Sequence, residues 1–185
     1  MKNVNLYLAE GFEEIEAVTV ADVLRRADIG VSMVSVTGRK EVKGAHGIII
    51  TADELFEKFD NHTADMIILP GGMPGTRNLG SHAGLKALIM DFAGKNKPIA
   101  AICAAPSVIG KLGLYKNKKA ACYPGFEDTL EGAILGDDIV VRDENLITSK
   151  GPGTAIYFAL NLVEFLAGKD VAMELHEGMI VQGEY

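Results

Sequence analysis

The chain has 185 residues, a length that fits one globular domain, and we predict a single domain over residues 1–185. Hydrophobic residues make up 48% and charged residues 23%, which is typical of a globular protein with a sizeable core. The net charge of −7 and the lack of a basic run argue against nucleic-acid binding. No apolar run approaches the length of a membrane span, so we expect no membrane partner either.

The two cysteines, Cys103 and Cys122, form no CxxC motif and no Cys/His ligand spacing. The sequence therefore predicts neither a disulfide framework nor a zinc site, and a reducing compartment is the default for such a chain. The first residues alternate in character and then meet Glu10 and Glu13, which is not the layout of a signal peptide. We expect a cytoplasmic protein with no metal.

In chain order, short apolar runs alternate with helical stretches. The first half predicts a strand over residues 4–9, a helix over 14–27, a strand over 31–36, a hairpin over 40–51 that turns at 44–47, a strand over 66–69 and a helix over 85–92. The second half predicts strands over 99–102, 119–122, 139–141 and 146–148 and helices over 105–112, 152–166 and 171–179. In the first helix, Ile15, Val18, Ala21 and Leu24 repeat on one face.

Strands that alternate with helices imply right-handed βαβ crossovers. The predicted fold is therefore an α/β sandwich with a mostly parallel central sheet and helices on both faces. Such sheets place ligands at the carboxyl ends of their strands, so the loops after the first, third and fourth long strands are where a site is expected.

The strand over 99–102 is followed directly by Cys103, with Ala101, Ala104 and Ala105 around it. Small neighbours permit a sharp turn from strand to helix that holds a nucleophile above the sheet. There, the following helix and its free N–H groups favour the thiolate, so we expect a pKa for Cys103 below the roughly 8.5 of a free thiol. A buried, inert cysteine is an equal alternative on position alone.

Gly71 and Gly72 end the strand over 66–69, in the stretch LPGGMPG. Without side chains, their backbone N–H groups can point into a site and serve as oxyanion donors beside Cys103. No phosphate-binding glycine motif is present. A plain tight turn is the alternative.

Carboxylates cluster after the first strand, in EGFEEIE at 10–16. Glu13 and Glu14 fit a role at the start of the helix, where negative charge suits the dipole. Glu16 precedes apolar residues and is a candidate to face inward, toward Cys103. A carboxyl group buried beside a thiol would have a raised pKa and could hold or pass a proton.

A further glycine cluster, KGPGTA at 150–155, opens the helix over 152–166. Gly151 and Gly153 could line the same pocket with their N–H groups. Helix initiation is the alternative, and we favour it for Pro152.

Taken together, GFEEIEAV at 11–18, DVLRRA at 22–27, LPGG at 69–72, AAICAAP at 100–106 and SKGPGTA at 149–155 resemble the ThiJ/PfpI family. The branch that the chain resembles is that of the parkinsonism-associated deglycase and its bacterial relatives. The resemblance runs over essentially the whole chain. Each motif is weak alone, but their combination in this order is specific.

This resemblance implies a flavodoxin-like sandwich, a homodimer and chemistry without a cofactor. It implies that Cys103 is the nucleophile and that Glu16 is a protonated glutamate hydrogen-bonded to its sulfur. Gly71, Gly72 and the N–H of Ala104 match the family's oxyanion pocket. Apolar positions in excess of one buried face, namely Val18, Val20 and Val23, are consistent with a dimer surface.

One departure from the family concerns the loop after the strand over 119–122, where many members carry a histidine. Here that position is Tyr123, a poor base at neutral pH and at most a pocket-lining side chain. His46 lies in the hairpin turn, near where relatives place an interface residue, although an exposed turn histidine is the favoured interpretation. Without the histidine, peptidase chemistry is not expected.

These residues leave three functions to consider. The first is an enzyme of glyoxalase or deglycase type that acts on small reactive carbonyls through Cys103 and Glu16. The second is a redox-responsive stress protein or chaperone whose Cys103 senses peroxide with little turnover. The third is a binding protein without chemistry. The retention of Cys103, Glu16 and both glycines argues against the third, but the sequence does not separate the first two.

Overall fold

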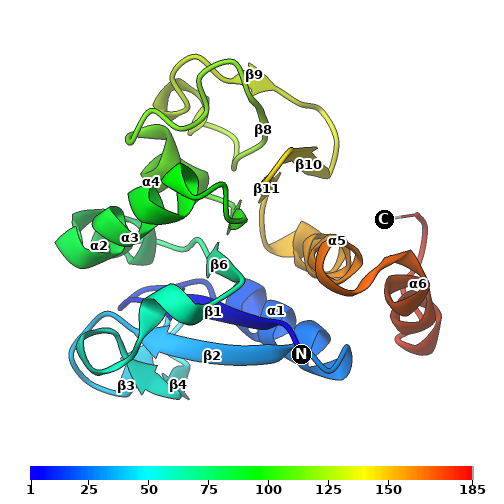
Figure 1. The fold of residues 1–185 in the computed structure, drawn as a ribbon, viewed down its shortest axis with the longest axis horizontal. Coiled ribbons are helices and arrows are strands. Elements are labelled where there is room, and N and C mark those ends of the chain that lie inside the picture. The colour runs from blue at the N-terminus through cyan, green and yellow to red at the C-terminus, as the bar shows by residue number, and fades with distance from the viewer. Residues whose placement is uncertain (185) are drawn as a thin grey trace.

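The computed structural model describes residues 1–184, which are built around a seven-stranded sheet of order β10-β11-β7-β6-β1-β2-β5 (Figure 1). Its strands are β1 (Asn3–Leu8), β2 (Gly30–Ser35), β5 (Glu54–Leu55), β6 (Met66–Leu69), β7 (Ile99–Ile102), β10 (Val140–Asp143) and β11 (Leu146–Ser149). Every neighbouring pair is parallel except β10 and β11. The mostly parallel sheet predicted from the sequence is confirmed.

The strands are apolar on both faces because each face is covered by helices. In β1, Val4, Leu6 and Leu8 join one hydrophobic cluster, whereas Tyr7 joins the other. The alternation follows from the two-residue period of a strand, and β6 and β7 divide their side chains between the clusters in the same way.

Helices α1 (Glu14–Arg26), α5 (Ala155–Ala167) and α6 (Lys169–Gly178) contribute to the first cluster. Helices α2 (Gly75–Ser81), α3 (Ala83–Gly94) and α4 (Pro106–Gly110) contribute to the second, and Figure 1 shows these three gathered together. Single 3₁₀ turns are η1 (Phe56–Lys58), η2 (Asn61–Thr63), η3 (Glu127–Thr129) and η4 (Pro152–Thr154). None of the helices within residues 1–184 combines the length and apolar character needed to cross a membrane.

The buried face of α1 differs from the predicted one. Ala21 and Leu24 are buried as expected, but Ile15 is 56% exposed and Val18 45% exposed. The side of α1 that packs on the core is adjacent to the predicted side and includes Val20. Its residues repeat every three or four positions, as one face of a helix requires. Because α1 is apolar on more than one side, its sequence did not identify which side faces the sheet.

Two small sheets stand apart from the central one. The predicted hairpin is confirmed as β3 (Glu41–Lys43) and β4 (Ile49–Thr51), which pair antiparallel. The strand predicted over 119–122 is shorter, β8 (Lys119–Ala120), and pairs with β9 (Ile134–Leu135) outside the central sheet. Helix α2 and strands β5 and β9 were not predicted, since a glycine-rich start and two-residue strands leave little periodic pattern.

Candidate active site

Cys103 lies at a sharp turn directly after β7. Its φ of 64° is in the left-handed region, which non-glycine residues seldom occupy and which is often found at functional positions. Its N–H donates to the carbonyl of Ser149 at 3.0 Å, and its own carbonyl accepts from the N–H of Tyr123 at 2.7 Å. The strand-to-helix elbow predicted from the small neighbouring residues is therefore confirmed, and it is held by two segments distant in sequence.

The helix after this elbow is shorter than predicted. Residues 105–112 were expected to be helical, but α4 covers only Pro106–Gly110 and begins three positions beyond Cys103. A single short turn of helix contributes little dipole, because the dipole is the sum over aligned peptide units. Stabilisation of a thiolate must therefore come from individual N–H groups and from the neighbouring side chain.

That neighbouring side chain is Glu16, which is fully buried, as the sequence suggested. Its Oε2 accepts a hydrogen bond from the N–H of Gly71 at 2.7 Å, while its Oε1 has no hydrogen-bond partner within the described residues. Burial raises the pKa of Glu16 to about 7, against the lowering effects of the Gly71 N–H and the Cys103 thiol. The charge of Glu13 adds a small further rise. Glu16 thus changes its protonation state near neutral pH.

Gly71 lies between Glu16 and Cys103, and because it has no side chain it leaves a small space between them. A Cβ atom placed there would lie 2.9 Å from Glu16 Oε2 and 3.0 Å from Cys103 Sγ, so both groups face the same small space. The expectation that the Gly71 N–H is an oxyanion donor is not met, because that N–H is bonded to the Glu16 carboxylate. The role of Gly71 is instead to position the carboxyl group and to leave room for the sulfur.

The Cys103 thiol is buried, at 7% exposure, and this changes its acidity. Burial, together with the negative charge of an ionised Glu16, raises its pKa to about 12. The backbone N–H groups of Gly72 and Ala104 hydrogen-bond the sulfur and act in the opposite direction. The depressed pKa expected from the elbow is therefore wrong, and burial of the sulfur is the main reason. Protonation of Glu16 removes one of the opposing charges, so the thiolate forms more readily in that state, although burial still disfavours it.

Replacing Glu16 with glutamine is therefore expected to make Cys103 more acidic. Glutamine retains an oxygen for the Gly71 N–H but removes the negative charge, so the apparent pKa of the thiol should fall by about one to three units. Iodoacetamide alkylation followed across pH measures this shift. Cys122 is the internal control, because its raised pKa of about 11 comes from burial and from Glu127. Identical pH profiles for Cys103 in wild type and variant would contradict the assignment.

Tyr123 and Gly151 lie against each other at the edge of this region. A Cβ at Gly151 would meet the Tyr123 ring at 3.2 Å, and the Gly151 N–H donates to the Thr154 hydroxyl at 3.1 Å. Gly153 faces open space. The N–H of Gly151 is thus used in helix initiation. Tyr123 is 46% exposed, and it contacts the elbow through its backbone N–H. Cys122 is a core residue, as predicted.

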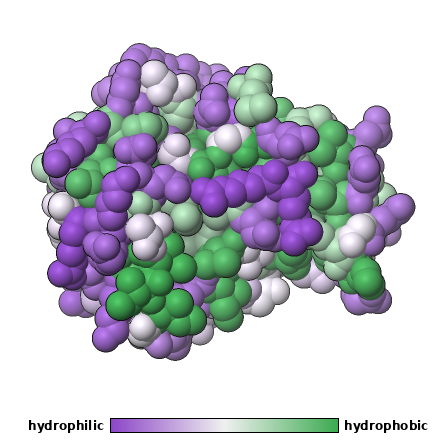
Figure 2. Space-filling view, turned by 90° about the horizontal axis from the view of Figure 1, so that it is seen from below, coloured by the Kyte–Doolittle hydropathy of each residue, from purple (hydrophilic) through white to green (hydrophobic). Residues whose placement is uncertain are grey.

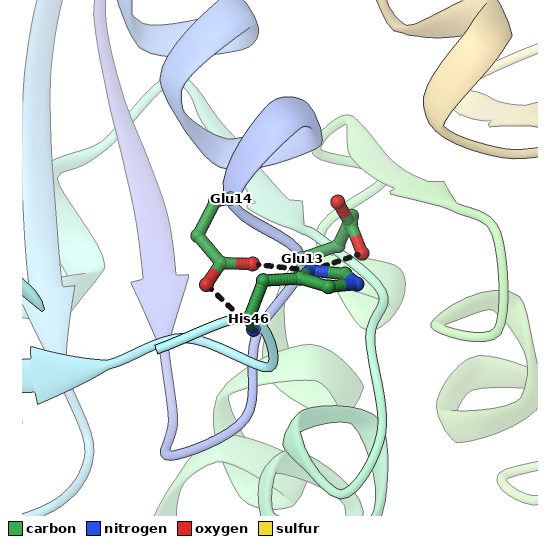
Figure 3. Close-up of side chains that lie close together, drawn as sticks. All are labelled: Glu13, Glu14 and His46. Atoms are coloured by element: carbon green, nitrogen blue, oxygen red, sulfur yellow. Dashed lines mark hydrogen bonds and ion pairs between the residues drawn. The ribbon is translucent and has the colours of Figure 1, made fainter. Parts of the chain in front are cut away.

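Glu14 at the start of α1 contacts His46 and Ile48 of the hairpin, and these contacts form the Glu14 clamp (Figure 3). The Glu14 carboxylate accepts from the backbone N–H groups of His46 and Ile48 at 2.8 and 3.3 Å, and it pairs with His46 Nδ1 at 2.9 Å. Burial acts to raise the pKa of Glu14, but these hydrogen bonds outweigh it and hold the pKa below its usual value. Glu13 approaches His46 Nδ1 at 3.6 Å.

The donor atoms of these three side chains lie within 4.8 Å of one another, a spacing that a metal ion would accept. The Glu14 carboxylate already accepts two backbone hydrogen bonds and faces His46 Nδ1, so the arrangement serves to anchor the hairpin. Glu14 was expected to interact with the helix dipole, but its carboxylate instead makes a tertiary contact with the hairpin. Sequence reasoning missed this contact because its two partners are 32 positions apart.

Comparison with known proteins shows that this chain is similar to proteins of a single family. The model of the DJ-1/PfpI family matches residues 2–165. A protein of Drosophila melanogaster called Protein dj-1beta is 38% identical over 182 residues, which are 97% of each chain. A protein of Caenorhabditis elegans called Glutathione-independent glyoxalase DJR-1.2 is 36% identical over 163 residues, 87% of this chain and 86% of the relative.

Solved structures agree with this result. The structure described as Toxoplasma gondii DJ-1, oxidized, superposes with a TM-score of 0.93 at 37% identity, covering 97% of this chain and 98% of the other. The α/β architecture is thus shared over almost the full length of both chains.

Proposed function

Since this chain belongs to the DJ-1/PfpI family, we propose that it is a cofactor-free, cysteine-dependent enzyme that acts on small reactive carbonyls or their adducts, of the glyoxalase or deglycase type. The observation that carries the proposal is the pairing of Cys103 with Glu16, a carboxyl group whose pKa of about 7 lets it both accept and return a proton. The glyoxalase name of the Caenorhabditis elegans relative supports the same chemistry.

In the first step, the Cys103 thiolate attacks the aldehyde carbon of a 2-oxoaldehyde such as methylglyoxal and forms a carbon–sulfur bond. The carbonyl oxygen takes up negative charge as its double bond opens. The N–H groups of Gly72 and Ala104, which already point at the sulfur, are suitable donors for this oxygen. Glu16, which accepted the proton of the Cys103 thiol, passes it to this oxygen, which completes a hemithioacetal and leaves Glu16 ionised.

In the second step, the ionised Glu16 removes the proton from the carbon bonded to sulfur and returns it to the neighbouring carbon, while the hydroxyl proton passes from the oxygen of the first carbon to the oxygen of the second. The product is a thioester of a 2-hydroxyacid, and no oxidant or reductant is consumed because the two carbons exchange oxidation states. Water then cleaves the thioester, releasing the hydroxyacid and restoring the thiol. A single proton shuttle is sufficient, so the histidine that Tyr123 replaces is not needed.

Peptidase activity is not part of this proposal. Acyl transfer from an amide requires protonation of the leaving nitrogen, usually by a positioned imidazolium. Tyr123 cannot supply that proton readily at neutral pH. The test of the proposed function is the formation of lactate from methylglyoxal by purified protein with reduced Cys103, compared with the Cys103→Ser variant.

A second candidate function is redox sensing at Cys103. The Toxoplasma gondii relative is described as oxidized, which favours an oxidisable residue in this family. In this chain, Oε1 of a protonated Glu16, which has no partner among residues 1–184, is a suitable donor to an oxygen added on the sulfur. We also propose a cytoplasmic location, which would keep the two free cysteines reduced. Protein that holds oxidised Cys103 and, after reduction, converts no methylglyoxal would favour sensing over turnover.

We further propose that the chain forms a homodimer through α1 and the hairpin. Of the three valines expected at this surface, Val20 and Val23 are each only 1% exposed within the chain itself and are not available. The exposed apolar side chains are instead Ile15, Val18, Ile48 and Ile49. The Glu14 clamp brings the two elements together, and Figure 2 shows apolar patches on a face of the molecule that is otherwise largely polar.

Replacing Val18 with glutamate is expected to convert the dimer to a monomer, because it places a charge in an apolar contact. Light scattering at micromolar concentration measures the mass. Ile134→Glu is the matched control, since Ile134 is also exposed, at 55%, but lies far along the chain in β9. A monomeric wild-type protein under the same conditions would refute the dimer.

A further inference from the structure

A cavity separate from the surroundings of Cys103 lies among α2, α3 and α4. It has a volume of about 430 Å³, within the range of small-molecule sites. Its lining contains none of the residues assigned to the proposed chemistry, so a ligand could bind there whether or not Cys103 turns over a substrate. Figure 1 shows the three helices gathered on one side of the sheet.

Three cations line this cavity: Arg77 from α2, Lys86 from α3 and Lys111 just after α4. None of their side chains makes an ion pair or a hydrogen bond with another of residues 1–184, and the cavity lining includes no carboxylate. Many other cations of the chain are paired, as Arg25 is with Asp53. In a protein of net charge −7, three unpaired cations around one cavity create a local field that attracts an anion.

A buried hydroxyl group provides a second, independent observation. Thr76 also lines the cavity and is 4% exposed, and its Oγ1 has no hydrogen-bond partner within the described residues. A buried polar group without a partner is costly, so such groups are normally satisfied by protein, water or ligand. Because this oxygen is covered in the structure, the Thr76 side chain would rotate to donate a hydrogen bond to an anionic oxygen between the cations.

The remainder of the lining is apolar and includes Val108, Leu112 and Phe126. The side chains therefore divide into a cationic, hydroxyl-bearing part and a hydrophobic part. We propose that this cavity binds a small organic anion in which a phosphate or carboxylate group is joined to an apolar body. The cations hold the charged group, and the apolar side chains cover the body.

The experiment is isothermal titration calorimetry of the 185-residue chain with phenyl phosphate. Saturable binding is expected, with inorganic phosphate and phenol each binding at least about tenfold more weakly because each lacks one of the two groups. Arg77→Gln and Lys111→Gln should each weaken phenyl phosphate binding by about tenfold, the usual effect of losing a hydrogen bond to a charged group. Lys58→Gln removes an exposed cation elsewhere and should change nothing.

A second variant fills the cavity without removing charge. A Cβ at Gly80 would lie 3.5 Å from Val108, so Gly80→Leu should extend into the cavity and abolish binding while Arg77 and Lys111 remain. Cys103→Ser should bind phenyl phosphate as wild type does, which separates this site from the proposed enzyme chemistry. The absence of saturable binding, or equal binding by wild type, Arg77→Gln and Gly80→Leu, would overturn the proposal.

Discussion

Replacing Cys103 with serine is expected to abolish the conversion of methylglyoxal to lactate. A serine hydroxyl is a far weaker nucleophile than a thiolate, and the N–H groups of Gly72 and Ala104 cannot compensate for this difference. Steady-state lactate production by protein with fully reduced Cys103 is the measurement. Cys122→Ser is the matched control, because that cysteine belongs to the hydrophobic core and should affect stability more than turnover.

Glu16→Gln separates nucleophile acidity from proton transfer. The variant should lose about two to four orders of magnitude in turnover, the contribution of a positioned acid–base group. Yet the same variant should be alkylated at Cys103 at lower pH than wild type. A residue that merely supports the fold would not move these two measurements in opposite directions.

Tyr123→Phe should cost little, since the contact of Tyr123 with the elbow is made by its backbone N–H. If Tyr123→Phe abolished turnover while Glu16→Gln left it intact, the assigned roles would be reversed. If reduced wild-type protein showed no conversion at all, redox sensing would replace catalysis as the proposed function.

Gly71→Ala is expected to disrupt the site more than its single methyl group suggests. The added Cβ would lie 2.6 Å from the Cβ of Cys103 and close to both Sγ and Glu16 Oε2, so one of the two functional side chains must move. Overpacking of this kind costs about 1 to 3 kcal/mol of folding stability. Displacement of the acid–base group from the reacting carbon should also lower turnover by about a hundredfold.

Thermal unfolding and lactate production, measured on the same preparation, test this variant. Gly94→Ala is the control, because a Cβ there meets nothing within 4 Å and the residue lies at the end of α3. Equal turnover for Gly71→Ala and wild type would show that the space between Cys103 and Glu16 is not required. Loss of stability with full turnover would give Gly71 a structural role only.

The central sheet could be predicted because its strands are short, apolar and regularly separated by helices. Strands β6 and β7 have the predicted bounds, Met66–Leu69 and Ile99–Ile102. The elbow at Cys103 was also predictable, since only small residues permit a sharp turn there. In contrast, the exposure of Ile15 and Val18 was not, because a helix with apolar residues on two sides does not indicate which side the sheet will cover.

The acidity of the site could not be predicted from local sequence. It depends on a charge brought close through space, from Glu16 in α1 to Cys103 after β7, and on which N–H groups remain for the sulfur. The bond from the Gly71 N–H to Glu16 removes one expected donor, a result that only the folded geometry provides. Residue types thus identified the participants, whereas their protonation is a property of the assembled pocket.

The elbow at Cys103 is held by backbone hydrogen bonds to two residues that come later in the chain, Tyr123 and Ser149. The ribosome synthesises Cys103 after Glu16 and the two glycines of the LPGG turn, but before Tyr123 and Ser149. In a nascent or truncated chain that ends before β11, Tyr123 is present but the Ser149 carbonyl is not, so we expect the elbow at Cys103 to be only partly held. We therefore expect the geometry around Cys103 to be complete only after β11 has been made and has paired with β7.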